Sequence, residues 1–176
     1  LPDKASIPFV MMRETAGIQV AVDYESEEDA CKKLKASLGI SPIVTAIFAN
    51  SPIRGGTDTG FKSYRAYSWL NTDETRCGLI DKKIFSDKNI FSFSDYIDIL
   101  LDLPMIFLQK EGRWINMKGM PFKKYLKYGY NNYRATIDDW FLHMSSFFPD
   151  TRLKNFIEIR NCDCQKAELI CSPAAL

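Results

Sequence analysis

A carboxylate and a guanidinium two residues apart, Glu158 and Arg160, are the side chains best placed for chemistry in this sequence. They lie in residues 153–163, whose alternation of apolar and polar residues predicts a β-strand. On such a strand the two charged side chains share one face, while Ile157 and Ile159 share the other. Their Cα atoms would be about 6.5 Å apart. The apolar face packs on a core, so the charged face looks into water or into a site.

Two interpretations of this charged face stay open. Glu158 and Arg160 form a surface ion pair, which contributes only about 0–1 kcal/mol to stability. Alternatively, Glu158 binds a hard cation such as Mg²⁺ through its oxygens, while the planar donor fork of Arg160 faces phosphate oxygens. The choice depends on the rest of the chain.

A second arginine lies beside an aromatic residue. If residues 60–78 are helical through their middle, Arg65 and Trp69 are four residues apart on the same side of the helix. Such a pair is either a structural cation–π contact or a pocket that grips a substrate carboxylate bidentately against an aromatic wall. Both interpretations stay open at this point.

A strand at residues 15–24 is expected to carry a matching polar face. Thr15, Gln19 and their alternate neighbours are small or hydrogen-bonding, whereas Ile18, Val20 and Val22 form the apolar face. A half-buried strand of this kind is typical of antiparallel sheets. If it joins the strand at 153–163 in one sheet, the two polar faces together make a polar, concave floor.

The remaining elements must support that sheet. Capping residues predict helices at residues 26–38, ended by Gly39, at 92–103 and at 136–148, with a shorter basic helix at 121–128. Residues 105–117 predict a hairpin, and the apolar run 43–50 is either a strand or a buried helix. The expected buried side of the helix at 136–148 comprises Ile137, Trp140, Phe141, Met144 and Phe147. His143 lies off this stripe and is expected to be a hydrogen-bonded structural residue.

Composition limits the classes of partner. The chain has 176 residues, 46% of them hydrophobic, which suffices for one domain spanning residues 1–176. The net charge of +1 gives no electrostatic footprint for nucleic acid or anionic lipid. No run approaches the roughly 20 apolar residues that span a bilayer. We therefore expect a soluble cytoplasmic protein with small-molecule or protein partners, and no pattern specifies an oligomeric state.

The cysteines do not suggest a disulfide framework or a metal centre. Their number, five, is odd and they are scattered, so we expect reduced thiols. Cys162, Cys164 and Cys171 with His143 would make four ligands, but their spacing matches none of the usual structural zinc patterns.

Several separated motifs together resemble one family, the plant and proteobacterial type of glutamate-cysteine ligase. They are TAGIQVAVDY at 15–24, FANSP at 48–52, GFKSYR at 60–65 with Trp69, DLPM at 102–105, GMPF at 119–122, and FPDTRLKNFIEIR at 148–160 with Asp163. These motifs cover nearly the whole chain in the expected order, which is more specific than any one of them.

The resemblance implies a fold and an activity. The fold is α+β and similar to glutamine synthetase, with a curved antiparallel sheet that has helices on its outer face and the active site on its concave face. The reaction uses ATP and Mg²⁺ to phosphorylate the side-chain carboxylate of glutamate, and the amine of cysteine then attacks the acyl phosphate. The protein must shield phosphate charge, orient the reactants and exclude water.

The resemblance also implies roles for single residues. Glu158 would be a metal ligand, with Gln19 near the metals, and Arg160 would stabilise the transferring phosphoryl group. Arg65 would bind a glutamate carboxylate, and Trp69 and Thr15 would line the substrate pocket.

The sequence departs from the family in two respects. The closely spaced glutamates of the family's N-terminal acidic strand have no counterpart here, which favours the interpretation of the chain as the central part of a larger catalytic domain. Ile106 stands where plant enzymes carry a tyrosine near the cysteine site. Two alternatives therefore accompany the ligase: a non-catalytic binding or interaction fragment, and a related carboxylate-amine ligase that uses another amine.

Overall fold

The computed structural model describes residues 7–79, 82–85 and 91–176 of the chain. It contains two compact units: unit 1 comprises Leu1–Phe85 and Pro149–Leu176, and unit 2 comprises Ser86–Phe148. Helices are mixed with small antiparallel sheets, which agrees with the predicted α+β class. The prediction of one domain over residues 1–176 stays a prediction.

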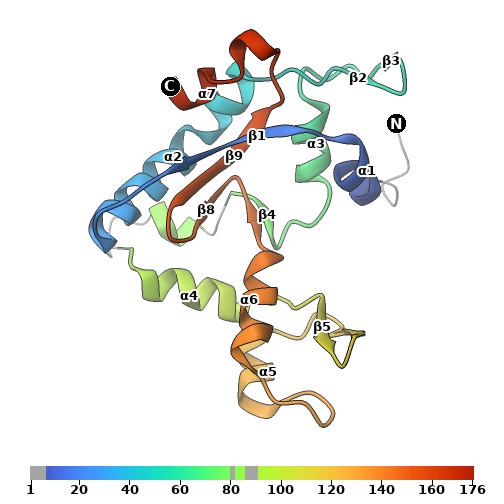
Figure 1. The fold of residues 1–176 in the computed structure, drawn as a ribbon, viewed down its shortest axis with the longest axis vertical. Helices are drawn as coiled ribbons and strands as arrows, with labels where there is room; N and C mark the ends of the chain where they lie inside the picture. The colour runs from blue at the N-terminus through green and yellow to red at the C-terminus, as the bar shows by residue number, and fades with distance from the viewer. Residues whose placement is uncertain (1–6, 80–81, 86–90) are drawn as a thin grey trace. The chain divides into compact units, whose positions relative to one another are not determined.

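Unit 1 is built on a three-stranded antiparallel sheet with the order β1-β9-β8 (Figure 1). The strand predicted at 15–24 is confirmed as β1 (Gly17–Val22). The strand predicted at 153–163 is confirmed over its larger part as β9 (Ile157–Asp163), but its predicted start was wrong, because Leu153 is the last residue of another strand, β8 (Thr151–Leu153). The chain turns between them, where the Lys154 N–H donates to the Phe156 carbonyl at 2.9 Å.

Helix α2 (Glu27–Ile47) packs on β8 and β9 and covers one side of this sheet (Figure 1). Its predicted N-cap is confirmed, since Ser26 Oγ accepts the Asp29 N–H at 3.2 Å. The predicted end at Gly39 was wrong, and the ambiguous run at 43–50 is mostly the second half of the same helix. The helix continues through Gly39 and Pro42 because its buried side continues: Leu34, Leu38, Ser41 and Val44 recur at helical spacing.

The other elements of unit 1 are short. They are α1 (Ile7–Glu14), the hairpin of β2 (Ile53–Arg54) and β3 (Thr57–Asp58), α3 (Tyr64–Leu70), β4 (Cys77–Gly78), the 3₁₀ helices η2 (Lys82–Phe85) and η3 (Ala167–Leu169), and α7 (Ser172–Ala175). The hairpin turns at Gly55 and Gly56, whose φ angles of 56° and 78° favour glycine. The predicted helix around Arg65 and Trp69 is confirmed as α3, which packs against α1 and β9.

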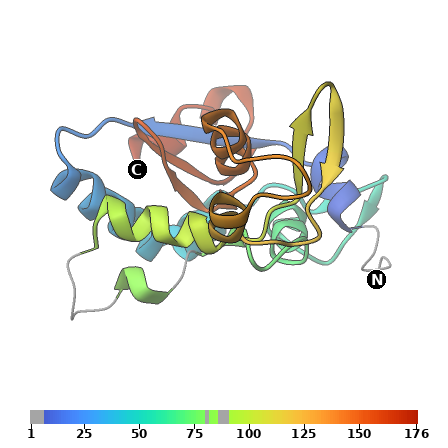
Figure 2. The same cartoon turned by 90° about the horizontal axis from the view of Figure 1, so that it is seen from below.

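Unit 2 has its own core. It contains α4 (Phe93–Asp102), the hairpin of β5 (Phe107–Lys110) and β6 (Arg113–Asn116), α5 (Phe122–Tyr128) and α6 (Ile137–Ser145), and β7 (Phe148–Pro149) leads back to unit 1. The hairpin, yellow in Figure 2, confirms the prediction. The apolar core of unit 2 comprises the buried residues Met105, Leu108, Met117, Phe122 and Tyr125.

Helix α6 buries polar residues where apolar ones were expected. The predicted buried residues Ile137 and Phe141 are 63% and 56% exposed, whereas Asp139 and His143 are buried. Polar partners make this burial tolerable: the Asp139 carboxylate accepts from Lys110 Nζ at 2.7 Å, and His143 Nε2 lies 2.8 Å from the Leu100 carbonyl oxygen. The structural role predicted for His143 is confirmed. In the described ranges, no helix combines the length and apolar character needed to cross a membrane.

Candidate functional site

A β-bulge in β9 sets the arrangement of the polar face of the sheet. Gln19 of β1 faces two residues of β9, Arg160 and Asn161, where a regular ladder would give one. Asn161 donates to the carbonyl of Ser41 in α2, and its neighbour Cys162 also packs on α2. The alternation is thereby shifted by one residue, so Asp163 returns to the face that carries Arg160.

Glu158 is the centre of a buried charge cluster on that face. Its carboxylate accepts from Arg152 Nη2 at 2.7 Å, from Lys154 Nζ at 2.8 Å and from Arg160 Nη1 at 3.0 Å. Burial raises the pKa of Glu158, but hydrogen bonds from Lys154 and Arg160 and the charge of Arg152 outweigh burial and lower the pKa to about 2. Glu158 and Arg160 therefore share a face, as predicted, in a buried cluster and not in a surface pair.

The residues of this cluster do not by themselves fit a Mg²⁺ site. Both carboxylate oxygens of Glu158 accept from cationic side chains. Gln19 is exposed on β1, opposite the bulge. In residues 7–79, 82–85 and 91–176, no three His, Cys, Asp or Glu side chains gather as a metal site would require. The metal roles of Glu158 and Gln19 stay predictions, and no chemical step is derived through the metal.

Arg65 reaches the same polar face from α3. Its side chain is buried, and Nη2 donates to the backbone carbonyl of Arg160 at 2.6 Å. Nη1 lies 3.9 Å from Asp163 Oδ1. Burial lowers the pKa of Arg65, and the Asp163 charge opposes that shift. Among the described residues the guanidinium donates only the bond to Arg160, so donors remain for a ligand.

Asp163 and Gly17 determine where Arg65 can lie. Asp163 is 2% exposed and accepts from Ser51 Oγ at 2.7 Å and from Ser63 Oγ at 2.9 Å. Ser51 Oγ in turn accepts the backbone N–H of Arg65 at 3.0 Å. Gly17 pairs with Asp163 across the sheet, and a Cβ on Gly17 would lie 2.6 Å from Arg65 Nε. The strand therefore admits Arg65 only because residue 17 has no side chain.

Trp69 contacts both arginines of the site. Its ring centroid lies 6.0 Å from Arg65 Cζ and 5.7 Å from Arg160 Cζ. Each distance is within the range of a cation–π interaction. The prediction that Arg65 and Trp69 share one side of a helix is confirmed, and Trp69 also joins that helix to Arg160 of β9.

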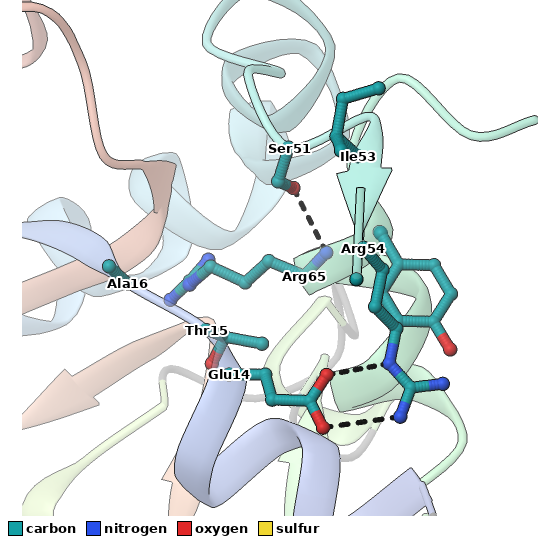
Figure 3. Close-up of a pocket in the computed structure, with 9 residues that line it drawn as sticks. Glu14, Thr15, Ala16, Ser51, Ile53, Arg54 and Arg65 are labelled. Carbon is teal, nitrogen blue, oxygen red and sulfur yellow. Dashed lines mark hydrogen bonds and ion pairs between the residues drawn. The ribbon is translucent and has the colours of Figure 1, made fainter. Parts of the chain in front are cut away.

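A pocket of about 340 Å³ opens beside Arg65 (Figure 3). It is lined by Glu14, Thr15, Ala16, Ser51, Ile53, Arg54, Gly55, Tyr64 and Arg65. Figure 3 shows the Arg65 side chain extending towards Ala16, while the charged groups of Glu14 and Arg54 point towards each other. Arg54 Nε and Nη2 donate to the Glu14 carboxylate at 2.6 and 3.2 Å.

The structure brings most of the predicted site residues together. Arg65, Trp69, Arg160 and Glu158 form one connected group. Thr15 lines the pocket with Arg65.

Sequence reasoning assigned no role to the other residues that shape the site, which are Glu14, Gly17, Arg54, Arg152, Lys154 and Asp163. The spacing of Arg152 and Lys154 before Glu158 was a usable signal, because a hairpin places Arg152 across from Glu158 and puts Lys154 in the turn, within reach of its carboxylate. No local signal marks Glu14 and Arg54, which lie 40 residues apart.

One family model and several known proteins are similar to this chain. The sequence model described as "Glutamate-cysteine ligase family 2(GCS2)" matches residues 7–176. Chloroplastic glutamate–cysteine ligases are similar to 93% of the chain: those of Brassica juncea and Arabidopsis thaliana are 37% and 36% identical, and ligase A of rice, Oryza sativa subsp. japonica, is 36% identical. The chain spans 32%, 31% and 33% of these relatives, about a third of their length.

Proposed function

The chain belongs to glutamate-cysteine ligase family 2, and we propose on that basis that it carries part of a site that joins glutamate to cysteine. In the proposed reaction ATP activates the side-chain carboxylate of glutamate, and the amine of cysteine displaces the phosphate. The reaction would be the first step of glutathione synthesis. The observation that carries the proposal is the pair of buried guanidiniums, Arg65 and Arg160, which lie against the same ring, that of Trp69, on the polar face of the sheet.

The two arginines have separate roles in this proposal. Arg65 donates to a carboxylate of glutamate in the pocket, where Thr15 is a neighbour and Trp69 supports the guanidinium. Arg160 stabilises negative charge on the transferring phosphoryl group, since a preorganised buried donor is effective against charge that develops in the transition state. Glu158 holds Arg160 by the ion pair at 3.0 Å, so Arg160 is already oriented before the reactants bind.

The finer features of the proposal follow the family. We propose a glutamine-synthetase-like arrangement, in which the face of the sheet opposite α2 is the catalytic face. ATP and Mg²⁺ are the proposed cofactors, and glutamate, cysteine and ATP are the proposed small-molecule partners. The cytoplasmic location stays a prediction, and the similar plant proteins are named as chloroplastic.

The test is ADP release by the full-length protein supplied with Mg-ATP and glutamate, with and without cysteine. Cysteine-stimulated release is expected. Arg65→Ala and Arg160→Ala should each lower turnover roughly a hundredfold or more, because each removes a charged contact to a reacting group. Lys32→Ala is the matched control, since Lys32 is an exposed cation on α2 that pairs with Glu28 at 2.7 Å.

The outcomes separate the alternatives. Release stimulated by another amine in place of cysteine would identify a related carboxylate-amine ligase. Glutamate binding without ADP release would favour a non-catalytic binding protein. Wild-type turnover in Arg65→Ala or in Arg160→Ala would refute the role of that arginine.

A further inference from the structure

The rim of the pocket carries two opposite charges that hold each other. Arg54 comes from the β2–β3 hairpin and Glu14 from the end of α1, and they form a bidentate pair at 2.6 and 3.2 Å (Figure 3). Both side chains line the pocket, and both are partly exposed, at 31% for Arg54 and 44% for Glu14. An exposed ion pair of this kind contributes little to stability, so a ligand that offers matching charges can replace it.

The inner part of the pocket offers hydrogen bonds that the protein leaves unused. The Arg65 guanidinium donates only one hydrogen bond to the described residues. The hydroxyl of Tyr64, another lining residue, is buried and interacts with Arg54, and it has no further hydrogen-bond partner in the described part of the chain. Buried polar groups are normally satisfied, so these groups indicate a polar ligand.

We propose that Glu14 and Arg54 recognise the zwitterionic head of an amino acid substrate. Glu14 accepts from the α-ammonium group, and Arg54 donates to the α-carboxylate. Each of the two side chains thus exchanges its partner in the protein for a substrate group that carries the same charge as that partner. The second carboxylate of the substrate binds Arg65. The pocket therefore selects an α-amino acid with a side-chain carboxylate, and this assignment rests on the proposed function, in which that carboxylate is activated.

Charge placement supports this orientation. Arg65 donates to the backbone of Arg160, so the inner end of the pocket leads towards the residue proposed to act on the phosphoryl group. The two residues of the Glu14–Arg54 pair come from different parts of the pocket lining: Glu14 is the last residue of α1, and Arg54 lies on β2. A substrate bound with its head at the rim presents its side-chain carboxylate to Arg65, the buried arginine of the lining. The volume of about 340 Å³ lies within the range of small-ligand pockets.

The experiment measures binding to the full-length protein of three ligands: L-glutamate, glutarate and 4-aminobutyrate. Glutarate lacks the α-ammonium group, and 4-aminobutyrate lacks the α-carboxylate. Equilibrium dialysis or calorimetry gives dissociation constants without any need for turnover. The variants are Glu14→Gln and Arg54→Gln, and Glu28→Gln on α2 is the control, because Glu28 also forms an exposed ion pair.

A crossed pattern is expected. Wild-type and Glu28→Gln proteins should prefer glutamate to each analogue by roughly ten- to a hundredfold, the effect of one charged hydrogen bond. Glu14→Gln should lose the preference over glutarate and keep the preference over 4-aminobutyrate, and Arg54→Gln should do the reverse. A general folding defect would instead weaken the binding of all three ligands by the same factor.

Two results would overturn the inference: no binding of glutamate by the wild-type protein, or wild-type preference ratios in both variants. The ADP-release assay is read separately. Crossed preferences without ADP release would refute the proposed ligase and leave the recognition of the amino acid head standing. Cysteine-stimulated ADP release with unchanged ratios would support the ligase and refute the roles of Glu14 and Arg54.

Discussion

At the scale of single residues, the Glu158 carboxylate contacts three cationic side chains, whereas the carboxylate of a simple ion pair contacts one. Arg152, Lys154 and Arg160 all donate to its carboxylate within 3.0 Å. Removing one member of a buried charge group costs more than the group contributes, because the other charges are then left without compensation. Glu158 therefore has a positioning role towards Arg160 whatever else it binds.

Glu158→Gln is expected to destabilise the protein in a pH-dependent way. The pKa of Glu158 falls from 4.5 to about 2 on folding, so its charge stabilises the folded state above pH 4.5. This contribution is lost as the pH falls from about 4.5 to 2, and its size is about 3 kcal/mol. Urea unfolding at pH 7 and at pH 3 should show a difference between wild type and variant that shrinks at the lower pH.

The control for this measurement is Glu28→Gln, whose carboxylate is exposed on α2. It should change the free energy of unfolding little at either pH. A Glu158→Gln protein that loses as much stability at pH 3 as at pH 7 would show that packing, and not charge, is what Glu158 supplies.

At the scale of elements, the approach of α3 to the sheet depends on one glycine. Gly17→Ala would place a Cβ 2.6 Å from Arg65 Nε and 2.8 Å from the Cys162 carbonyl oxygen. Because a backbone atom is one of the two, the strand itself must shift. We expect a loss of about 1–3 kcal/mol of stability and weaker glutamate binding. Thermal unfolding and equilibrium dialysis would measure the two effects.

Gly39→Ala is the same chemical change at a position with free space, and we expect it to stabilise the protein. Gly39 lies inside α2, and its nearest neighbour to an added Cβ is Phe85, at 4.0 Å. Alanine there should stabilise the helix by about 0.5–1 kcal/mol and leave glutamate binding unchanged. If both variants bind glutamate like wild type, Gly17 does not control the position of Arg65.

Much of the secondary structure could be predicted from local sequence. Ser92 and Thr136 are followed by acidic residues that complete capping boxes, and both helices begin where these patterns predict. The hairpin of β5 and β6 follows from Gly112 at its turn. Such signals depend on neighbours a few residues away, which is why a single sequence contains them.

The phase of β9 could not be predicted in the same way. A strict period of two places Asp163 with Ile157 and Ile159, on the face opposite Arg160. The bulge opposite Gln19 reverses that assignment, and it depends on pairing with a strand more than a hundred residues away. The ion pair between Glu14 and Arg54 likewise exists only after α1 and the β2–β3 hairpin meet. Tertiary pairing, and not local propensity, decides these features.

At the scale of the whole molecule, each unit holds an apolar core of its own. Leu38 is 1% exposed in unit 1, and Leu108 is 0% exposed in unit 2. Leu108→Ala should destabilise unit 2 by about 2–5 kcal/mol. Native-state hydrogen exchange should show faster exchange in residues 105–143 and little change in β9.

Leu38→Ala is the reciprocal variant, and its effect should concentrate in unit 1. Equal loss of protection in both units, for either variant, would show that the chain unfolds as one cooperative structure and would favour the predicted single domain over residues 1–176.

The two guanidiniums beside Trp69 also make this residue an optical reporter. The emission energy of an indole depends on charges close to its ring, and both Arg65 and Arg160 lie within 6.0 Å of this one. A ligand that neutralises either cation should therefore shift the fluorescence of Trp69. The other two tryptophans of this sequence, Trp114 and Trp140, belong to unit 2, so replacing them with phenylalanine leaves Trp69 as its single tryptophan. Trp69 is thus an intrinsic fluorophore of the site, and its emission can follow ligand binding in real time without a label.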